Sequence, residues 1–206
     1  MENDENGTSS FDSLEEYKEY FEPIFRADSE FSQKFIPLAK QILLKNIVII
    51  YSHEHHATQQ DKENDLQGKD GTVVFPRVPP PFGIRVRRDT EKYLSYGDFT
   101  IDTKEWRINL EDKYYVYGYG IENPIKFRLW VLIDYQGLRK VEKLGKIHGK
   151  LMPNRDHSLV DFWCFKLSEM FKLGVILDWD GEKQLIEQIL GKDALKPRNL
   201  QLTNFV

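Results

Sequence analysis

Cysteine is nearly absent from this chain, because Cys164 is its only cysteine among 206 residues. A single thiol excludes an internal disulfide and is typical of proteins that fold in a reducing compartment. Apolar runs long enough to span a membrane are also missing. The opening MENDENGTSS has no apolar core of the kind found in secretory signals. We therefore expect an intracellular protein of the nucleus or cytoplasm, not secreted and with no membrane partner.

Motifs that bind cofactors or metals are missing as well. There is no P-loop, and GYG at 118–120 does not match a dinucleotide-binding fingerprint. The run HEHH at 53–56 is not HExxH, and no further ligands at metal-binding spacing accompany it. The stretch DWDG at 178–181 lacks the remaining ligands of a calcium loop. We expect no cofactor and no metal, and the sequence favours a non-catalytic protein over an enzyme.

Charge is abundant but unevenly distributed. The whole chain carries −4, but residues 1–72 hold 7 Lys+Arg against 15 Asp+Glu, a net charge of −8. Residues 73–155 hold 16 Lys+Arg against 10 Asp+Glu, a net charge of +6. Either the two parts neutralise each other in the folded protein, or the basic middle contacts a polyanion.

The basic middle alternates between apolar and polar residues, with turn signals between short segments. This pattern is typical of strands that follow one another in an antiparallel meander. The candidate strands are 84–88, 98–109, 113–121, 126–134 and 138–151. The run KNIVIIYS at 45–52 and the run VILDW at 175–179 indicate further strands.

Helical spacing of apolar residues appears on both sides of this block. We predict helices at 13–23 and about 29–45, the second with a break near Pro37, and at 158–173 and about 181–190. Together these elements predict an α+β fold, in which two N-terminal and two C-terminal helices pack on an antiparallel sheet of about five to seven strands. Residues 1–10 are expected to form a disordered tail, and 11–206 one domain with a flexible loop at 53–71.

The predicted strand 113–121 is rich in tyrosine. Tyr115, Tyr117 and Tyr119 share one face, and two glycines on the opposite face leave room for a helix to approach closely. The tyrosines either pair with aromatic residues of neighbouring strands or form a docking platform for a protein partner. Trp130, on the next strand, extends the candidate platform. We expect a binding module within a larger complex.

A second candidate surface is basic. If 138–151 is a strand, its basic side chains Lys140, Lys146, His148 and Lys150 share one face. This face is either simply solvated or tracks the phosphates of a nucleic acid. Arginines of the strand 84–88 extend it, namely Arg85, Arg87 and Arg88.

The alternative interpretation is a small metal-dependent hydrolase of the nuclease type. Asp98, Asp102 and Glu105 are carboxylates of the kind that hold magnesium for phosphoryl chemistry, with Lys104 beside them. An enzyme of this kind needs a concave pocket in which these groups converge, whereas a docking module needs a flat or grooved patch.

Overall fold

The computed structural model describes residues 25–27, 29–47, 49–52, 71–74, 82–108, 112–153 and 161–196. Within these ranges helices and strands are mixed, so the predicted α+β class is confirmed. No helix in the described ranges is long and apolar enough to cross a membrane.

The main sheet has five strands in the order β1-β4-β6-β7-β10. Their bounds are β1 Phe25–Ala27, β4 Phe82–Arg88, β6 Tyr114–Glu122, β7 Ile125–Asp134 and β10 Ile176–Gly181. The pairs β1–β4 and β4–β6 are parallel, whereas β6–β7 and β7–β10 are antiparallel. The sheet is therefore mixed, and the prediction of a single antiparallel meander is wrong for its first half.

A second, antiparallel sheet has the order β5-β9-β8. Its strands are β5 Asp98–Asp102, β9 Phe162–Lys166 and β8 Lys150–Met152. Two further strands, β2 Ile49–Ser52 and β3 Gly71–Val74, pair only with each other among the described residues.

Some of the helices begin where a polar side chain caps a free backbone N–H group. The Ser29 hydroxyl accepts from the backbone N of Ser32 at 3.2 Å, and the Asp134 carboxylate accepts from the backbone N of Gly137 at 2.8 Å. The helical segments are α2 Glu30–Gln33, α3 Ile36–Ile47, α5 Glu91–Tyr96, α6 Thr103–Ile108, α7 Tyr135–Lys143, α8 Leu167–Lys172, α9 Lys183–Ile189 and the 3₁₀ helix η2 Lys192–Leu195.

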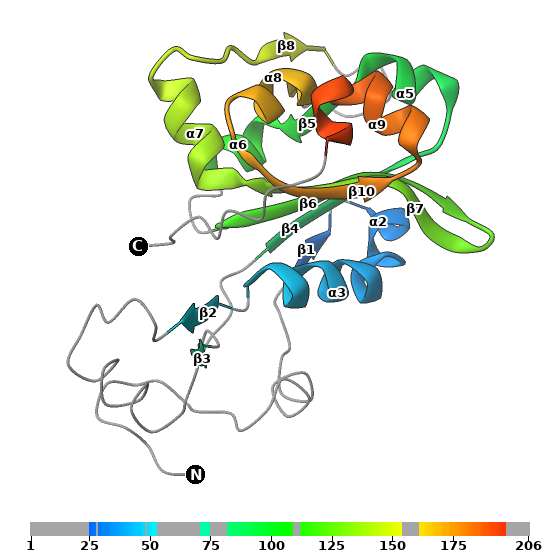
Figure 1. The fold of residues 1–206 in the computed structure, drawn as a ribbon. Helices are drawn as coiled ribbons and strands as arrows, with labels where there is room; N and C mark the ends of the chain where they lie inside the picture. Colours follow the sequence, from blue (N-terminus) through cyan, green and yellow to red (C-terminus); the bar gives the residue numbers. More distant parts are fainter. Residues whose placement is uncertain are drawn as a thin grey trace.

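The main sheet separates two hydrophobic cores. Figure 1 shows α2 and α3 on one side of the sheet, and the second sheet with α5 to α9 on the other. The smaller core joins α2 and α3 to the side chains of Ile84 and Val116. The larger core contains Phe99, Phe165 and the inward residues of α7, α8 and α9. Because the two cores cover both faces of β6, every residue of this strand from Tyr114 to Gly120 is buried.

Two predicted elements have the wrong secondary structure. The segment 138–151 is not one strand, because Asp134 caps a helix, α7, whose buried face includes Tyr135 and Leu138. The segment 158–173 is not one helix, because its aromatic run forms β9, which pairs with β5 in the register Thr100↔Cys164. Strand propensity of aromatic residues and a nonlocal partner outweigh the helical spacing here.

Other predictions match the structure closely. The helix predicted at 29–45 is broken before Pro37 into α2 and α3, and the strands predicted at 84–88, 113–121 and 126–134 correspond to β4, β6 and β7. The strand predicted at 98–109 ends at Asp102, where α6 begins. The tail at 1–10, the helix at 13–23 and the loop at 53–71, including HEHH, lie outside the described residues except for Gly71, which begins β3.

Candidate functional site

The three tyrosines of β6 lie in the larger core. Tyr115, Tyr117 and Tyr119 have exposed fractions of 0%, 1% and 1%. The ring of Phe99 on β5 packs edge-on against Tyr115 and Tyr117, with centroid distances of 5.3 Å in both cases. The predicted tyrosine docking platform is therefore wrong, because the second sheet covers this face of β6.

The polar ends of two of these tyrosines have internal partners. The Tyr115 hydroxyl donates to Glu105 Oε1 at 2.8 Å, and the Tyr117 hydroxyl donates to the backbone oxygen of Asp98 at 2.7 Å. Burial raises the pKa of Tyr117 and of Tyr119 above the usual value for tyrosine. These side chains are therefore neutral structural groups at physiological pH.

The three arginines of β4 also have partners within the fold. Arg85 is 3% exposed and forms an ion pair with Glu105 at 3.1 Å. Arg87 donates to the hydroxyl of Thr100. Arg88 is exposed but forms an ion pair with Glu122 at 2.8 Å. The expected extension of the basic face by these residues is wrong for Arg85, which solvent barely reaches.

The carboxylates of the hydrolase interpretation stabilise the fold. Asp98 forms an ion pair with Lys166 at 2.7 Å. Asp102 accepts a hydrogen bond of 2.7 Å from the backbone N–H of Lys104 at the start of α6. Glu105 binds Arg85 and Tyr115, as described above. No group of three His, Cys, Asp or Glu side chains in the described residues is arranged to hold a metal ion. The geometry thus favours structural roles for these three residues.

Trp130, the fourth predicted partner-binding residue, lies in a groove. We call this the α3–β7 groove, an open cavity of about 380 Å³ between helix α3 and the strands β7 and β10. Its walls combine large apolar side chains with a few polar ones: Leu38, Gln41, Ile42, Lys45, Ile125, Lys126, Phe127, Trp130, Asp180 and Gly181.

Close packing beneath the groove explains its shape. A Cβ atom added at Gly120 would lie 2.4 Å from Cζ of Phe35, so only glycine lets this ring sit against β6. Phe35 in turn contacts the Phe127 ring at a centroid distance of 5.0 Å. Phe35, in the turn between α2 and α3, thus packs closely on the glycine face at Gly120, and α3 lies beside the first residues of β7.

The far end of α3 is joined to β10 by polar contacts. Asn46 donates to Asp178 at 2.9 Å, and Lys45 lies 3.6 Å from the same carboxylate. Asp178 is only 5% exposed, so these contacts offset the cost of burying its charge. These contacts hold the end of α3 against β10 at this end of the groove.

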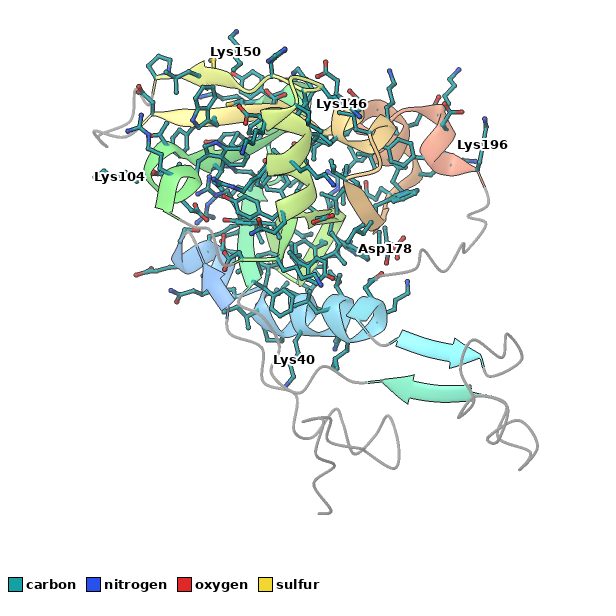
Figure 2. The ribbon with its side chains drawn as sticks, turned by 90° about the vertical axis from the view of Figure 1, so that its left-hand side faces the viewer. Lys40, Lys104, Lys146, Lys150, Asp178 and Lys196 are labelled. Carbon is teal, nitrogen blue, oxygen red and sulfur yellow. The ribbon has the colours of Figure 1, made fainter. Side chains whose placement is uncertain are left out.

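The predicted basic face is distributed over several elements. Lys140 lies on α7, Lys146 and His148 in the turn after it, and Lys150 on β8. All four side chains are exposed, and none has an ion-pair partner among the residues that the structure describes. Figure 2 shows Lys146 and Lys150 at the end of the molecule opposite α3, which carries Lys40. We call the surface that carries Lys140, Lys146, His148 and Lys150 the basic end.

Sequence reasoning missed a cavity beside the basic end. It is open to solvent, measures about 460 Å³ and is lined by Trp106, Gln136, Arg139, Lys140, Glu142 and Lys143. Gln136, Arg139, Lys140 and Lys143 have the spacing i, i+3, i+4, i+7, which marks one face of a helix. That signal was present but was concealed by the prediction of a strand at 138–151.

Comparison with known proteins identifies no relative, since neither a family model, nor a curated protein, nor a solved structure matches the chain.

Proposed function

We propose that the protein is a non-catalytic binding module of a larger complex, and that a segment of a protein partner binds in the α3–β7 groove. The observation that carries the proposal is the apolar floor of the groove, where Trp130 is only half-buried and Ile125 is 48% exposed. Tryptophan is enriched among residues that dominate binding energy at protein interfaces. The proposal retains Trp130 as a partner-binding residue and drops the three tyrosines.

The surroundings of the floor indicate what kind of segment would bind. Leu38 and Ile42 face the groove one helical turn apart on α3, so an apolar stripe of a partner helix or strand would find matching contacts. Covering a large aliphatic side chain fully contributes roughly 1.5–3 kcal/mol.

Site-specific crosslinking and one substitution test this proposal. A photoreactive amino acid at Gln41, on the groove wall, should capture a partner that the same group at Lys183 on α9 does not. The identified partner is then purified for affinity measurements. Ile125→Asp should weaken its binding at least tenfold, because the change removes apolar contact and places a charge in the interface.

The matched control is Leu173→Asp. Leu173 is an exposed aliphatic residue at the end of α8, outside the groove. It should leave the affinity unchanged. Equal affinities for the wild-type protein and Ile125→Asp would remove the groove from the binding surface.

We further propose that the basic end contacts nucleic acid. The supporting observation is that its lysines are exposed and form no ion pair with any described residue, so their charge is available to phosphates. Replacing Lys146 and Lys150 together by Glu should lower the slope of log affinity against log salt by roughly two units, one for each lost phosphate contact. The measurement is a salt titration with single-stranded and double-stranded oligonucleotides, and an unchanged slope would contradict the proposal.

A further inference from the structure

The cavity beside α7 brings together three positive side chains. Arg139, Lys140 and Lys143 line it from successive turns of one helix, together with the amide of Gln136. Glu142 is the single carboxylate among the lining residues. Three cations and one anion leave the described lining with a formal charge of +2, in a concave position rather than on a convex face.

Arg139 is held in place by the fold. Its guanidinium lies 4.7 Å from the centre of the Trp106 ring and donates to the backbone oxygen of Trp106. The same Nη1 atom lies 3.4 Å from the Tyr135 hydroxyl. These contacts use one nitrogen of the guanidinium and fix its plane, so the loss of side-chain entropy on binding an anion is small for this residue.

The two lysines serve no evident structural purpose. Lys140 and Lys143 are exposed, and within the described part of the chain neither ammonium group forms an ion pair or a hydrogen bond. In contrast, Lys166 and Lys34 are paired with carboxylates of neighbouring elements. Unpaired cations at the rim of a cavity, beside one fixed guanidinium, form an arrangement that matches a group with several acceptor oxygens.

We propose that this cavity binds a phosphate group. A phosphate offers several acceptor oxygens to lysine ammonium and arginine guanidinium donors, which a neutral ligand does not. The Trp106 ring already contacts Arg139, Tyr135 and Phe165, so the cavity offers charge rather than a free aromatic surface for stacking a base. The inference deepens the proposed contact with nucleic acid by naming the place where a phosphate would bind, but it does not depend on the groove.

Inorganic phosphate is the first probe. Heat of binding and amide chemical shifts of the full chain are followed during titration with sodium phosphate, with sodium chloride at equal ionic strength as reference. Saturable binding is expected with phosphate only, with the largest shifts in α7. The double variant K140Q/K143Q should weaken binding about tenfold, because the phosphate loses two charge contacts at the exposed edge of the cavity.

Controls separate this site from general attraction to positive charge. K183Q/K192Q removes two exposed lysines near α9 and should leave phosphate affinity unchanged. The variant Arg139→Lys keeps the charge but loses the planar fork, and it should also weaken binding. Absence of saturable phosphate binding, or equal effects of the two double variants, would overturn the proposal.

Oligonucleotides form the second arm of the experiment. Phosphate binding that depends on Lys140 and Lys143, without oligonucleotide binding, would support the cavity and contradict the nucleic-acid proposal. Oligonucleotide binding that is lost in K146E/K150E but unaffected by K140Q/K143Q would support the basic end and overturn the cavity as its phosphate site.

Discussion

Gly120 is the position at which a single added methyl group should disturb the fold most directly. In Gly120→Ala the new Cβ would lie 2.4 Å from Cζ of Phe35 and 2.9 Å from Cγ1 of Val86. The φ angle of Gly120 is not positive, so alanine meets no backbone strain there. The effect of the substitution therefore reports the close packing of Phe35 on β6 and little else.

The expected magnitude follows from how little the neighbours can move. Ordinary contacts of a Cβ atom lie at 3.4–4 Å, so the Phe35 ring would have to move by about 1 Å. Phe35 is fully buried, and it is held between the rings of Phe31 and Phe127 at centroid distances of 5.2 Å and 5.0 Å. Overpacking of this kind costs about 1–3 kcal/mol. For a domain of this size, the melting temperature should fall by about 2–12 °C.

A double-mutant cycle with Phe35→Leu tests the stated cause. The smaller side chain leaves space over β6, so Gly120→Ala should cost at least about 1 kcal/mol less in the Phe35→Leu background. Urea unfolding of the four proteins, monitored by circular dichroism, gives the free energies, and an unchanged m-value shows that they are comparable. Additive effects within about 0.3 kcal/mol would refute the argument that the ring and the glycine are packed against each other.

Two further predictions concern the larger core. Phe165 is 1% exposed and Trp163, on the same strand face, is half-buried, so Phe165→Ala should cost about 3–5 kcal/mol and Trp163→Ala less, as measured by urea unfolding. Burial raises the pKa of Tyr117, Tyr119 and Tyr135, the last to about 12, so the unfolded chain loses these protons first as the pH rises. The contribution of these tyrosines to the free energy of unfolding is complete below pH 10 and should decline above it by up to about 1.4 kcal/mol per pH unit for each tyrosine. Alkaline unfolding followed by tyrosinate absorbance would detect this decline. A constant free energy of unfolding between pH 9 and 12 would contradict the prediction.

The sequence predicts the central strands well because their signals are local. The alternation of apolar residues and the turn at Asn123-Pro124 place β6 and β7 to within one residue at each end. The break in the helix at 29–45 was predictable from Pro37 for the same reason. By contrast, the parallel pairing of β4 with β6 depends on the path of α5, β5 and α6 between them, which no local pattern encodes.

The candidate sites were harder to predict because they depend on contacts between distant residues. A strand with a row of tyrosines has a half-solvated face only if no other element covers that face. Here β5 covers it, and Glu105 accepts a hydrogen bond from the Tyr115 hydroxyl. Trp130 does not extend the tyrosine face as expected, because it pairs with Gly118 and lies on the opposite side of the sheet, where the distant helix α3 forms the groove beside it. The cavity beside α7 escaped prediction for a simpler reason, since the sequence pattern did not identify Asp134 as a helix cap.

The division of the molecule into two cores has a consequence for cooperativity. The layer formed by α2 and α3 packs on one face of the sheet through its own set of residues, separate from those that hold the second sheet. Such a layer can open as an independent unit, with amide hydrogen exchange faster than in β6 and β7. Under the proposed function, a segment bound in the α3–β7 groove joins this layer to the sheet, so it would raise the free energy of that local opening by RT ln(1 + [L]/Kd). Partner binding would then slow amide hydrogen exchange in α3, while exchange in the rest of the fold would stay unchanged.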